Sequence, residues 1–303
     1  AEWIARIESL ERGGDRGRIR GLLSARDQFL REIKSPRQAD TPKKSTMSAD
    51  DRLSQALLLA FPDRVARRRS PGDLRGLMVA SPANPTGTML DHAAMSALIG
   101  ACHDKGASFI SDEIYHGVEY EKKAVTALEI TDECYVINSF SKYFSMTGWR
   151  LGWLVLPPAL VPVIERLAQH LFICPSSISQ QAALACFTPE TLAIYETRRA
   201  AFKARRDFFI PALNRLGLSV PVMPDGAFYA YANCESACER WGISPSKTAG
   251  SWEFARALMQ RAHIAATPGR DFADAAPHQY LRFSTASSME QLQTAVTRLE
   301  ATL

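Results

Sequence analysis

The sequence of 303 residues lacks several features that would place it in a special class of protein. It has no apolar run long enough to cross a bilayer, and its first residues contain no apolar core of a signal peptide. Its formal net charge is only +4, which is too small to indicate nucleic acid as a partner. We therefore expect a cytoplasmic protein of one or two domains, without membrane or nucleic-acid partners.

The spacing of the cysteines also lacks the patterns that are typical of metal sites. The chain has six cysteines, and only Cys234 and Cys238 lie close together. This pair has neither a second cysteine pair nor histidines at zinc-binding spacing. We therefore expect reduced, partly buried thiols and no metal site.

From about residue 72 onward, short apolar runs alternate with helical segments. The expected strands of the first part are 74–80, 107–111, 135–138 and 152–156. The expected helices are 91–103, 160–171, 178–187 and a long one from 188 to 216, with Asp91 and Thr188 as N-caps and Gly217 as its end. This alternation predicts an α/β fold with a mainly parallel sheet.

The last third of the chain indicates a smaller second unit. We expect strands at 226–231 and 280–284, a loop at 265–272, and helices at 251–262 and 288–303. We expect the long helix 188–216 to lead into this second domain.

Lys142 stands just after the apolar run 135–138, with Ser139 before it and Arg150 after it. A partly buried lysine loses some of the cost of deprotonation and can form a Schiff base. Serine hydroxyls and a guanidinium can hold a phosphate dianion. The set suits a phosphorylated aldehyde cofactor, whereas a lone lysine in a loop would be read as a surface residue.

The whole stretch from Ser139 to Trp153 resembles the cofactor-lysine signature of class I/II aminotransferases, the fold-type I pyridoxal phosphate-dependent transferases. Three further motifs carry the resemblance: Asn84-Pro85-Thr86-Gly87, Ser111-Asp112-Glu113-Ile114-Tyr115 and Leu281-Arg282-Phe283-Ser284. It implies a three-layer α/β/α large domain over residues 71–195, which is incomplete against the family, and a small α+β domain over residues 196–303.

The resemblance also implies a role for each motif residue at the cofactor pyridoxal 5'-phosphate. Lys142 would hold it as a Schiff base, and Ser139 and Arg150 would bind its phosphate. Tyr115 and Asn84 would hydrogen-bond its ring oxygen.

Asp112 follows an apolar strand, where a carboxylate can keep the ring nitrogen protonated. An isolated aspartate at this place is more often a turn residue. Arg282 is similar to the family's binding residue for the substrate α-carboxylate, with Asn84 beside it. A planar guanidinium can grip a carboxylate at two points, although an edge-strand arginine is also a common surface residue.

The implied activity moves an amino group from an α-amino acid to a 2-oxo acid, and the family implies a homodimer. Three alternatives stay open: a β-lyase on the same fold, a cofactor-binding remnant without turnover, and a regulator with a DNA-binding segment. The regulator is the weakest, because residues 1–70 show no compact helix-turn-helix pattern.

Residues 1–70 do not match the family, and we expect them to be partly helical or disordered. The family carries a phosphate-binding turn and a ring-stacking aromatic residue before the Asn84 loop. The nearest counterpart of that turn is Lys44-Ser45-Thr46, which contains no glycine. A truncated or rearranged gene, or a divergent domain, would each produce such a segment.

Overall fold

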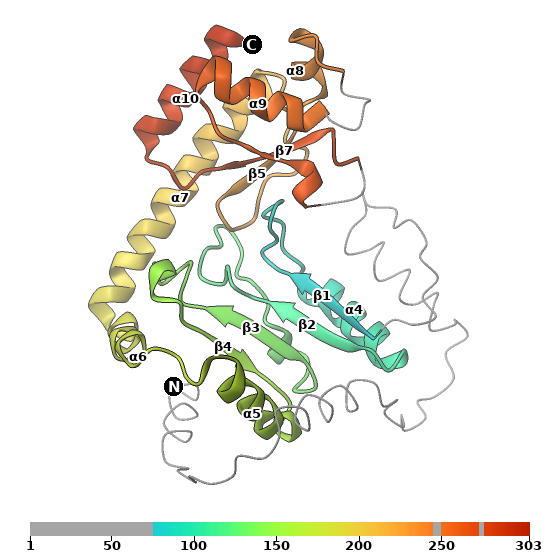
Figure 1. Ribbon diagram of the computed structural model, residues 1–303, viewed down its shortest axis with the longest axis vertical. Helices are drawn as coiled ribbons and strands as arrows, with labels where there is room; N and C mark the ends of the chain where they lie inside the picture. Colours follow the sequence, from blue (N-terminus) through green and yellow to red (C-terminus); the bar gives the residue numbers. More distant parts are fainter. Residues whose placement is uncertain (1–74, 245–249, 273–275) are drawn as a thin grey trace. The chain divides into compact units, whose positions relative to one another are not determined.

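The computed structural model describes residues 75–244, 250–272 and 276–303 (Figure 1). The predictions for residues 1–70, including the turn at Lys44-Ser45-Thr46, lie outside this range. Among the described residues, 159–174 are assigned to a different compact unit from the rest, and helix α5 spans Val161–Phe172 there. No helix in the described ranges is both long and apolar enough to cross a membrane.

The first sheet has four strands in the order β1-β2-β3-β4. Their bounds are Gly76–Ala80, Ser108–Asp112, Tyr135–Ser139 and Gly152–Val155. The first three strands run parallel, and β4 is antiparallel to β3. The predicted α/β class with a mainly parallel sheet is confirmed. Because parallel strands end at one edge, Ala80, Asp112 and Ser139 all close their strands there.

Helix α4 (His92–Asp104) packs against this sheet. Its N-cap is Asp91, as predicted, and the carboxylate of Asp91 accepts a hydrogen bond from Ala94 N at 2.8 Å. Met95 and Leu98 of the helix are fully buried. They share a core with the strand residues Val79, Phe109 and Val136. Each such side chain contributes about 1.5–3 kcal/mol to folding.

Helices α6 (Ser177–Leu184) and α7 (Pro189–Arg215) follow. The hydroxyl of Thr188 accepts from Thr191 N at 3.3 Å, which confirms the predicted N-cap of α7. Gly217, with a φ of +75°, follows the last turn. The 27 residues of α7 span roughly 40 Å and include Pro211. The helix crosses residue 195, where we predicted a domain boundary. That boundary stays a prediction.

The second sheet is antiparallel, in the order β5-β7-β6. Its strands span Tyr229–Asn233, Tyr280–Ser284 and Thr267–Pro268. The helices of this part are α8 (Glu235–Arg240), α9 (Gly250–Ala262) and α10 (Met289–Thr302). Their core includes Leu213, Phe254, Leu258, Leu281 and Leu299, all fully buried. The predicted α+β character of this part is confirmed.

Three details of the second part differ from the prediction. The strand expected from Gly226 begins only at Tyr229, because Ala227 has a φ of +57° and Gly226 bridges to Glu119 instead. The expected loop 265–272 contains the short strand β6. Helix α8 was not predicted, since its six residues are too few for a periodic pattern.

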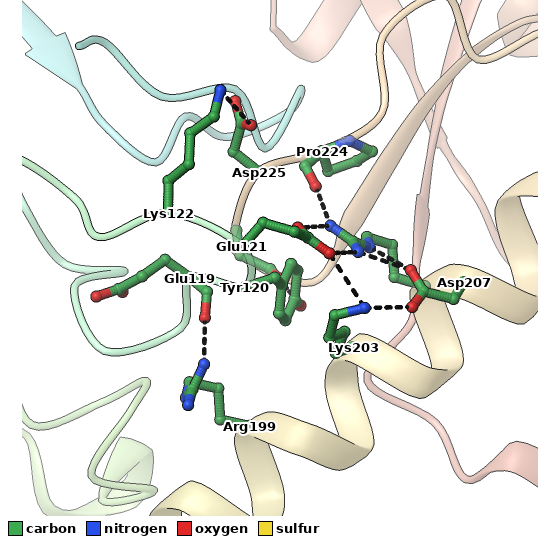
Figure 2. A network of polar contacts seen from close by, with 11 residues as sticks. Glu119, Tyr120, Glu121, Lys122, Arg199, Lys203, Asp207, Pro224 and Asp225 are labelled. Carbon is green, nitrogen blue, oxygen red and sulfur yellow. Dashed lines mark hydrogen bonds and ion pairs between the residues drawn. The ribbon is translucent and has the colours of Figure 1, made fainter.

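A buried arginine on α7 ties two loops to this helix, and Figure 2 labels its partners Glu121, Asp207 and Pro224. Arg206 is 4% exposed and donates to Glu121 at 2.8 Å, to Asp207 at 2.8 Å and to the Pro224 carbonyl at 2.7 Å. Its guanidinium also lies 4.5 Å from the ring centre of Tyr120. A buried cation is costly unless it is paired, and these partners supply the pairing.

Two neighbouring cations on α7 extend this network. Lys203 pairs with Glu121 at 3.1 Å and with Asp207 at 2.7 Å, and it is itself partly exposed. Arg199 donates to the Glu119 carbonyl at 3.0 Å. The loop that follows Tyr115 is therefore held on α7 at several points.

Candidate functional site

Lys142 lies in the loop that joins β3 to β4, at the edge where the parallel strands end. The loop is closed by hydrogen bonds from Phe140 N to Leu151 O at 3.0 Å and from Met146 N to Phe140 O at 2.9 Å. The Nζ atom of Lys142 lies 5.5 Å from the ring centre of Tyr115 and 5.9 Å from that of Phe228. The amine therefore faces residues that follow β2 and precede β5.

Aromatic side chains pack together within this loop and between it and α7. The rings of Phe140, Phe144 and Trp153 pack together, and Tyr195 of α7 joins them. The hydroxyl of Tyr143, next to Lys142, donates to Glu196 Oε1 at 2.8 Å. The backbone that carries the lysine is therefore held by packing on both sides.

The two predicted phosphate ligands come from opposite ends of the same loop. Ser139 Oγ lies 2.9 Å from Ser141 Oγ and accepts from Ser141 N at 3.0 Å. Arg150 is exposed, and its Nη1 donates to the Thr147 carbonyl at 2.9 Å. Both residues lie at the expected edge of the sheet, and their joint action on a phosphate stays a prediction.

Asp112 is the last residue of β2. Its Oδ1 accepts from Ile114 N at 3.2 Å, which is the turn role that a strand-end aspartate commonly has. This bond uses one of the two carboxylate oxygens. Burial raises the pKa of the nearby Tyr115 hydroxyl, and the Asp112 charge adds a smaller contribution in the same direction. Its predicted role at a ring nitrogen stays a prediction.

The neighbouring Glu113 is a structural carboxylate that sequence reasoning did not single out. It is 3% exposed, and its Oε1 accepts from Ser111 Oγ and Ala127 N, each at 2.9 Å. Its Oε2 lies 3.4 Å from Nδ1 of His116, whose Nε2 lies 3.1 Å from the Ser81 carbonyl. These contacts give His116 and Glu113 structural partners in the loop that follows β2.

Asn84 and Arg282, the two residues predicted at the substrate carboxylate, lie in direct contact. Arg282 Nη1 donates to Asn84 Oδ1 at 2.7 Å, and Nη2 is 3.4 Å from Thr267 Oγ1. The guanidinium carbon lies 4.3 Å from the ring centre of Tyr229 and 4.6 Å from that of Phe272. Arg282 is thus held by two rings, an amide and a hydroxyl.

Tyr115, predicted at the cofactor ring oxygen, shares a hydrogen bond of 2.7 Å with the hydroxyl of Tyr229. Both residues are buried. Burial raises the pKa of the Tyr115 hydroxyl well above its ordinary value, so that this group keeps its proton.

Sequence reasoning missed Tyr229, Thr267 and Phe272. One signal was present for the first of them, because two-residue alternation puts Tyr229 and Tyr231 on one face of a strand. The register of β5 on β7 pairs Tyr231 with Arg282, which places Tyr229 diagonally beside the arginine. That register is a property of the folded sheet.

The described residues thus combine a mixed α/β sheet with a lysine, a carboxylate, an amide and an arginine near one edge. This is the fold of the type I pyridoxal phosphate-dependent transferases. A family model described as "Aminotransferase class I and II" matches residues 63–299. The chain belongs to this family.

Individual relatives support the same assignment. The chain is 36% identical over 228 residues to a valine–pyruvate aminotransferase of Mycobacterium tuberculosis, covering 75% of this chain and 56% of the relative. It is 34% identical over 230 residues to an aspartate aminotransferase of Geobacillus stearothermophilus, covering 74% and 56%. The chain therefore spans little more than half the length of these relatives.

A solved structure supports the fold. The aspartate aminotransferase from Thermus thermophilus, crystallised with maleate, superposes with a TM-score of 0.69 at 31% identity. The match covers 80% of this chain and 60% of that one. Members of this family depend on pyridoxal phosphate in general.

Proposed function

We propose that this protein is a pyridoxal phosphate-dependent aminotransferase that moves an amino group from an α-amino acid to a 2-oxo acid. The observation that carries the proposal is the convergence of the Lys142 amine with Tyr115 and, through Tyr229, with the Asn84–Arg282 pair. The family assignment supports it. The activity, the substrates and the partners are proposed for this chain because it spans only part of its relatives' length.

The chemistry of the residues at this edge fits the cofactor. An amine suits its aldehyde, a carboxylate at Asp112 suits its ring nitrogen, and hydroxyl and amide donors at Tyr115 and Asn84 suit its ring oxygen. Hydroxyl and guanidinium donors at Ser139 and Arg150 suit its phosphate. When bound, the cofactor supplies an electron-accepting ring that makes the substrate Cα–H bond acidic.

The chain's own residues then have separate tasks. Arg282 binds the substrate α-carboxylate with its planar guanidinium, and Asn84 orients that guanidinium, so the Cα–H bond is held in one direction. The amine of Lys142 takes the proton from the substrate Cα atom and later returns a proton, acting as general base and then as general acid. Asp112 keeps a proton at the cofactor ring nitrogen.

We further propose a cytoplasmic homodimer. Ile178 and Leu184 of α6 are 73% and 62% exposed, and a second copy would cover such apolar side chains. All six cysteines are free, as suits a reducing compartment. Sedimentation velocity tests the dimer, with Ile178→Glu expected to lower self-association. A monomer at micromolar concentration contradicts this part of the proposal.

The test of the proposed function starts with the cofactor adduct. The purified protein is loaded with pyridoxal 5'-phosphate, reduced with borohydride, digested, and searched by mass spectrometry for the modified lysine. We expect the adduct on Lys142 and its loss in Lys142→Ala. Lys122→Ala, at an exposed lysine, is the matched control and should keep it. An adduct on another lysine contradicts the proposal.

A panel of amino acids then tests turnover on the loaded protein. Conversion to the corresponding 2-oxo acid, with the cofactor left in its amine form, is the expected result. Release of the β-substituent together with ammonia and the remaining 2-oxo acid identifies a β-lyase. An intact Lys142 adduct without any conversion identifies a remnant that binds the cofactor but does not turn over.

A further inference from the structure

Tyr229 joins the two parts of the site that the proposed function uses. Its hydroxyl lies 2.7 Å from the Tyr115 hydroxyl, and its ring centre lies 4.3 Å from the Arg282 guanidinium carbon. Tyr229 is 8% exposed, and its ring meets that of Tyr115 at 81° with 5.7 Å between centres. One side chain thus contacts both the predicted cofactor ligand and the predicted substrate ligand.

Either tyrosine can be the donor in this hydrogen bond between hydroxyls, and the two cases have different consequences for the cofactor. Each tyrosine has one hydroxyl hydrogen. If Tyr115 donates to Tyr229, its hydrogen is used within the pair and cannot reach the cofactor. If Tyr229 donates, the Tyr115 hydrogen is free for the ring oxygen, and the accepted bond makes Tyr115 a stronger donor.

We infer that Tyr229 is a positioning residue that donates to Tyr115 and so directs the Tyr115 hydrogen toward the cofactor ring oxygen, while its ring supports the Arg282 guanidinium. The inference rests on the proposed function and deepens it. Tyr229 itself need touch neither the cofactor nor the substrate.

The Tyr229 hydroxyl should affect the absorbance of the bound cofactor, which a purely structural residue would not do. A donor at the ring oxygen competes with the proton that this oxygen shares with the Lys142 nitrogen. Weakening the donor makes the oxygen more basic, so this proton is held more tightly and the bound cofactor changes colour at a higher pH. A net hydrogen bond of ordinary strength corresponds to an upward shift of roughly 0.3 to 1 pH unit.

The experiment compares Tyr229→Phe, Tyr115→Phe and the double variant in the cofactor-loaded protein. Absorbance is followed against pH, and the cofactor Kd is measured by equilibrium dialysis. We expect Tyr229→Phe to shift the colour change upward and to leave the KM for the amino acid within about twofold, because the ring remains. The double variant should shift no further than Tyr115→Phe alone, since Tyr229 acts through Tyr115.

The ring is tested separately with Tyr229→Leu. Loss of the ring face beside Arg282 should raise the amino-acid KM by roughly three- to tenfold in addition to the same colour shift. Tyr280→Phe is the matched control, because this tyrosine lies on the adjacent strand and stacks on Tyr231. It should leave both readouts unchanged. If Tyr229→Leu fails to fold, Tyr229→Phe decides the inference.

Two results overturn the inference while leaving the proposed function intact. One is a Tyr229→Phe protein whose colour changes at the wild-type pH. The other is a double variant whose shift is the sum of the two single shifts. A wild-type protein that forms no coloured adduct at Lys142 overturns the proposed function and this inference together.

Discussion

The side chains of Asn84 and Arg282 form a hydrogen bond of 2.7 Å although 198 positions separate them in the sequence. Asn84 lies in the loop after β1, and Arg282 lies on β7 of the second sheet. The amide oxygen faces a cation, so the bond is charge-assisted and stronger than a neutral one. The orientation of Asn84 is therefore linked to that of the arginine.

The first prediction concerns this arginine. Arg282→Lys keeps the charge but loses the planar fork that grips a carboxylate at two points. We expect the KM for the amino acid to rise by roughly tenfold or more, equivalent to about 1.4 kcal/mol of binding. Steady-state kinetics measure this. Arg270→Lys, at an exposed arginine stacked on Trp252, serves as the control. An unchanged KM in Arg282→Lys would rule out the carboxylate role.

The second prediction concerns Arg206, the buried cation of the network on α7. Arg206→Met removes the hydrogen bond to the Pro224 carbonyl and the contact with the Tyr120 ring. We expect a loss of about 2 to 3 kcal/mol in the free energy of unfolding, measured by urea denaturation. Lys203→Met is the comparison, since this partly exposed lysine should change the urea midpoint very little. Equal effects of the two variants would contradict a special role for Arg206.

The third prediction is a pH dependence at Glu121. The hydrogen bond from Arg206 lowers the pKa of the Glu121 carboxyl from 4.5 to about 2. Its folded-state pKa lies below the unfolded one, so its stabilising effect is present above about pH 4.5 and is lost as the pH falls toward 2. Because the side chain is half exposed, we expect only about 1 kcal/mol.

Thermal unfolding of wild type and Glu121→Gln at several pH values measures this contribution. The wild type should be the more stable protein at pH 7, and the difference in Tm should shrink steadily between pH 4.5 and pH 2. Asp207 still pairs with Arg206 in the variant, so the buried cation keeps a partner. A difference that stays constant over this range would contradict the assignment.

The fourth prediction concerns Gly117, which has a φ of +88°. A Cβ atom there would lie 2.5 Å from the ring of Tyr143, the neighbour of Lys142. Gly117→Ala should cost about 2 to 3 kcal/mol of unfolding free energy and weaken cofactor binding, because the ring must move. Gly106→Ala is matched in backbone, with a φ of +63°, and among the described residues no atom outside its chain neighbours lies within 4 Å of the new Cβ.

Gly106→Ala should therefore cost only the backbone strain, about 1 kcal/mol, and leave cofactor binding unchanged. Urea denaturation and equilibrium dialysis measure the two effects. If both alanine variants behaved alike, the close approach of Tyr143 would have no influence on the site.

Much of the fold could be predicted because the signals are local. Asp91 and Thr188 each supply a side-chain oxygen to the first turn of a helix, and the structure has both caps. The apolar runs that became β1, β2 and β3 are short and bounded by polar residues. Such a run indicates a strand wherever it stands in the chain.

Candidate residues of the site could be singled out from the sequence for a different reason. Lys142, Asp112, Asn84 and Arg282 carry chemistry that their neighbours in the sequence make recognisable. Tyr229 and Thr267 carry no such mark, because a tyrosine and a threonine in strands are ordinary residues. Their importance follows from what they touch.

The sequence by itself determined the α/β class and the helix caps and marked Lys142 as a candidate, because each depends on residues close together in the chain. The tertiary structure alone decided that Asn84 contacts Arg282 and that Tyr229 lies between Arg282 and Tyr115. Those contacts depend on the register of β5 on β7 and on how the second sheet meets the loops of the first. Such relations come from packing over long sequence separations, which no local pattern encodes.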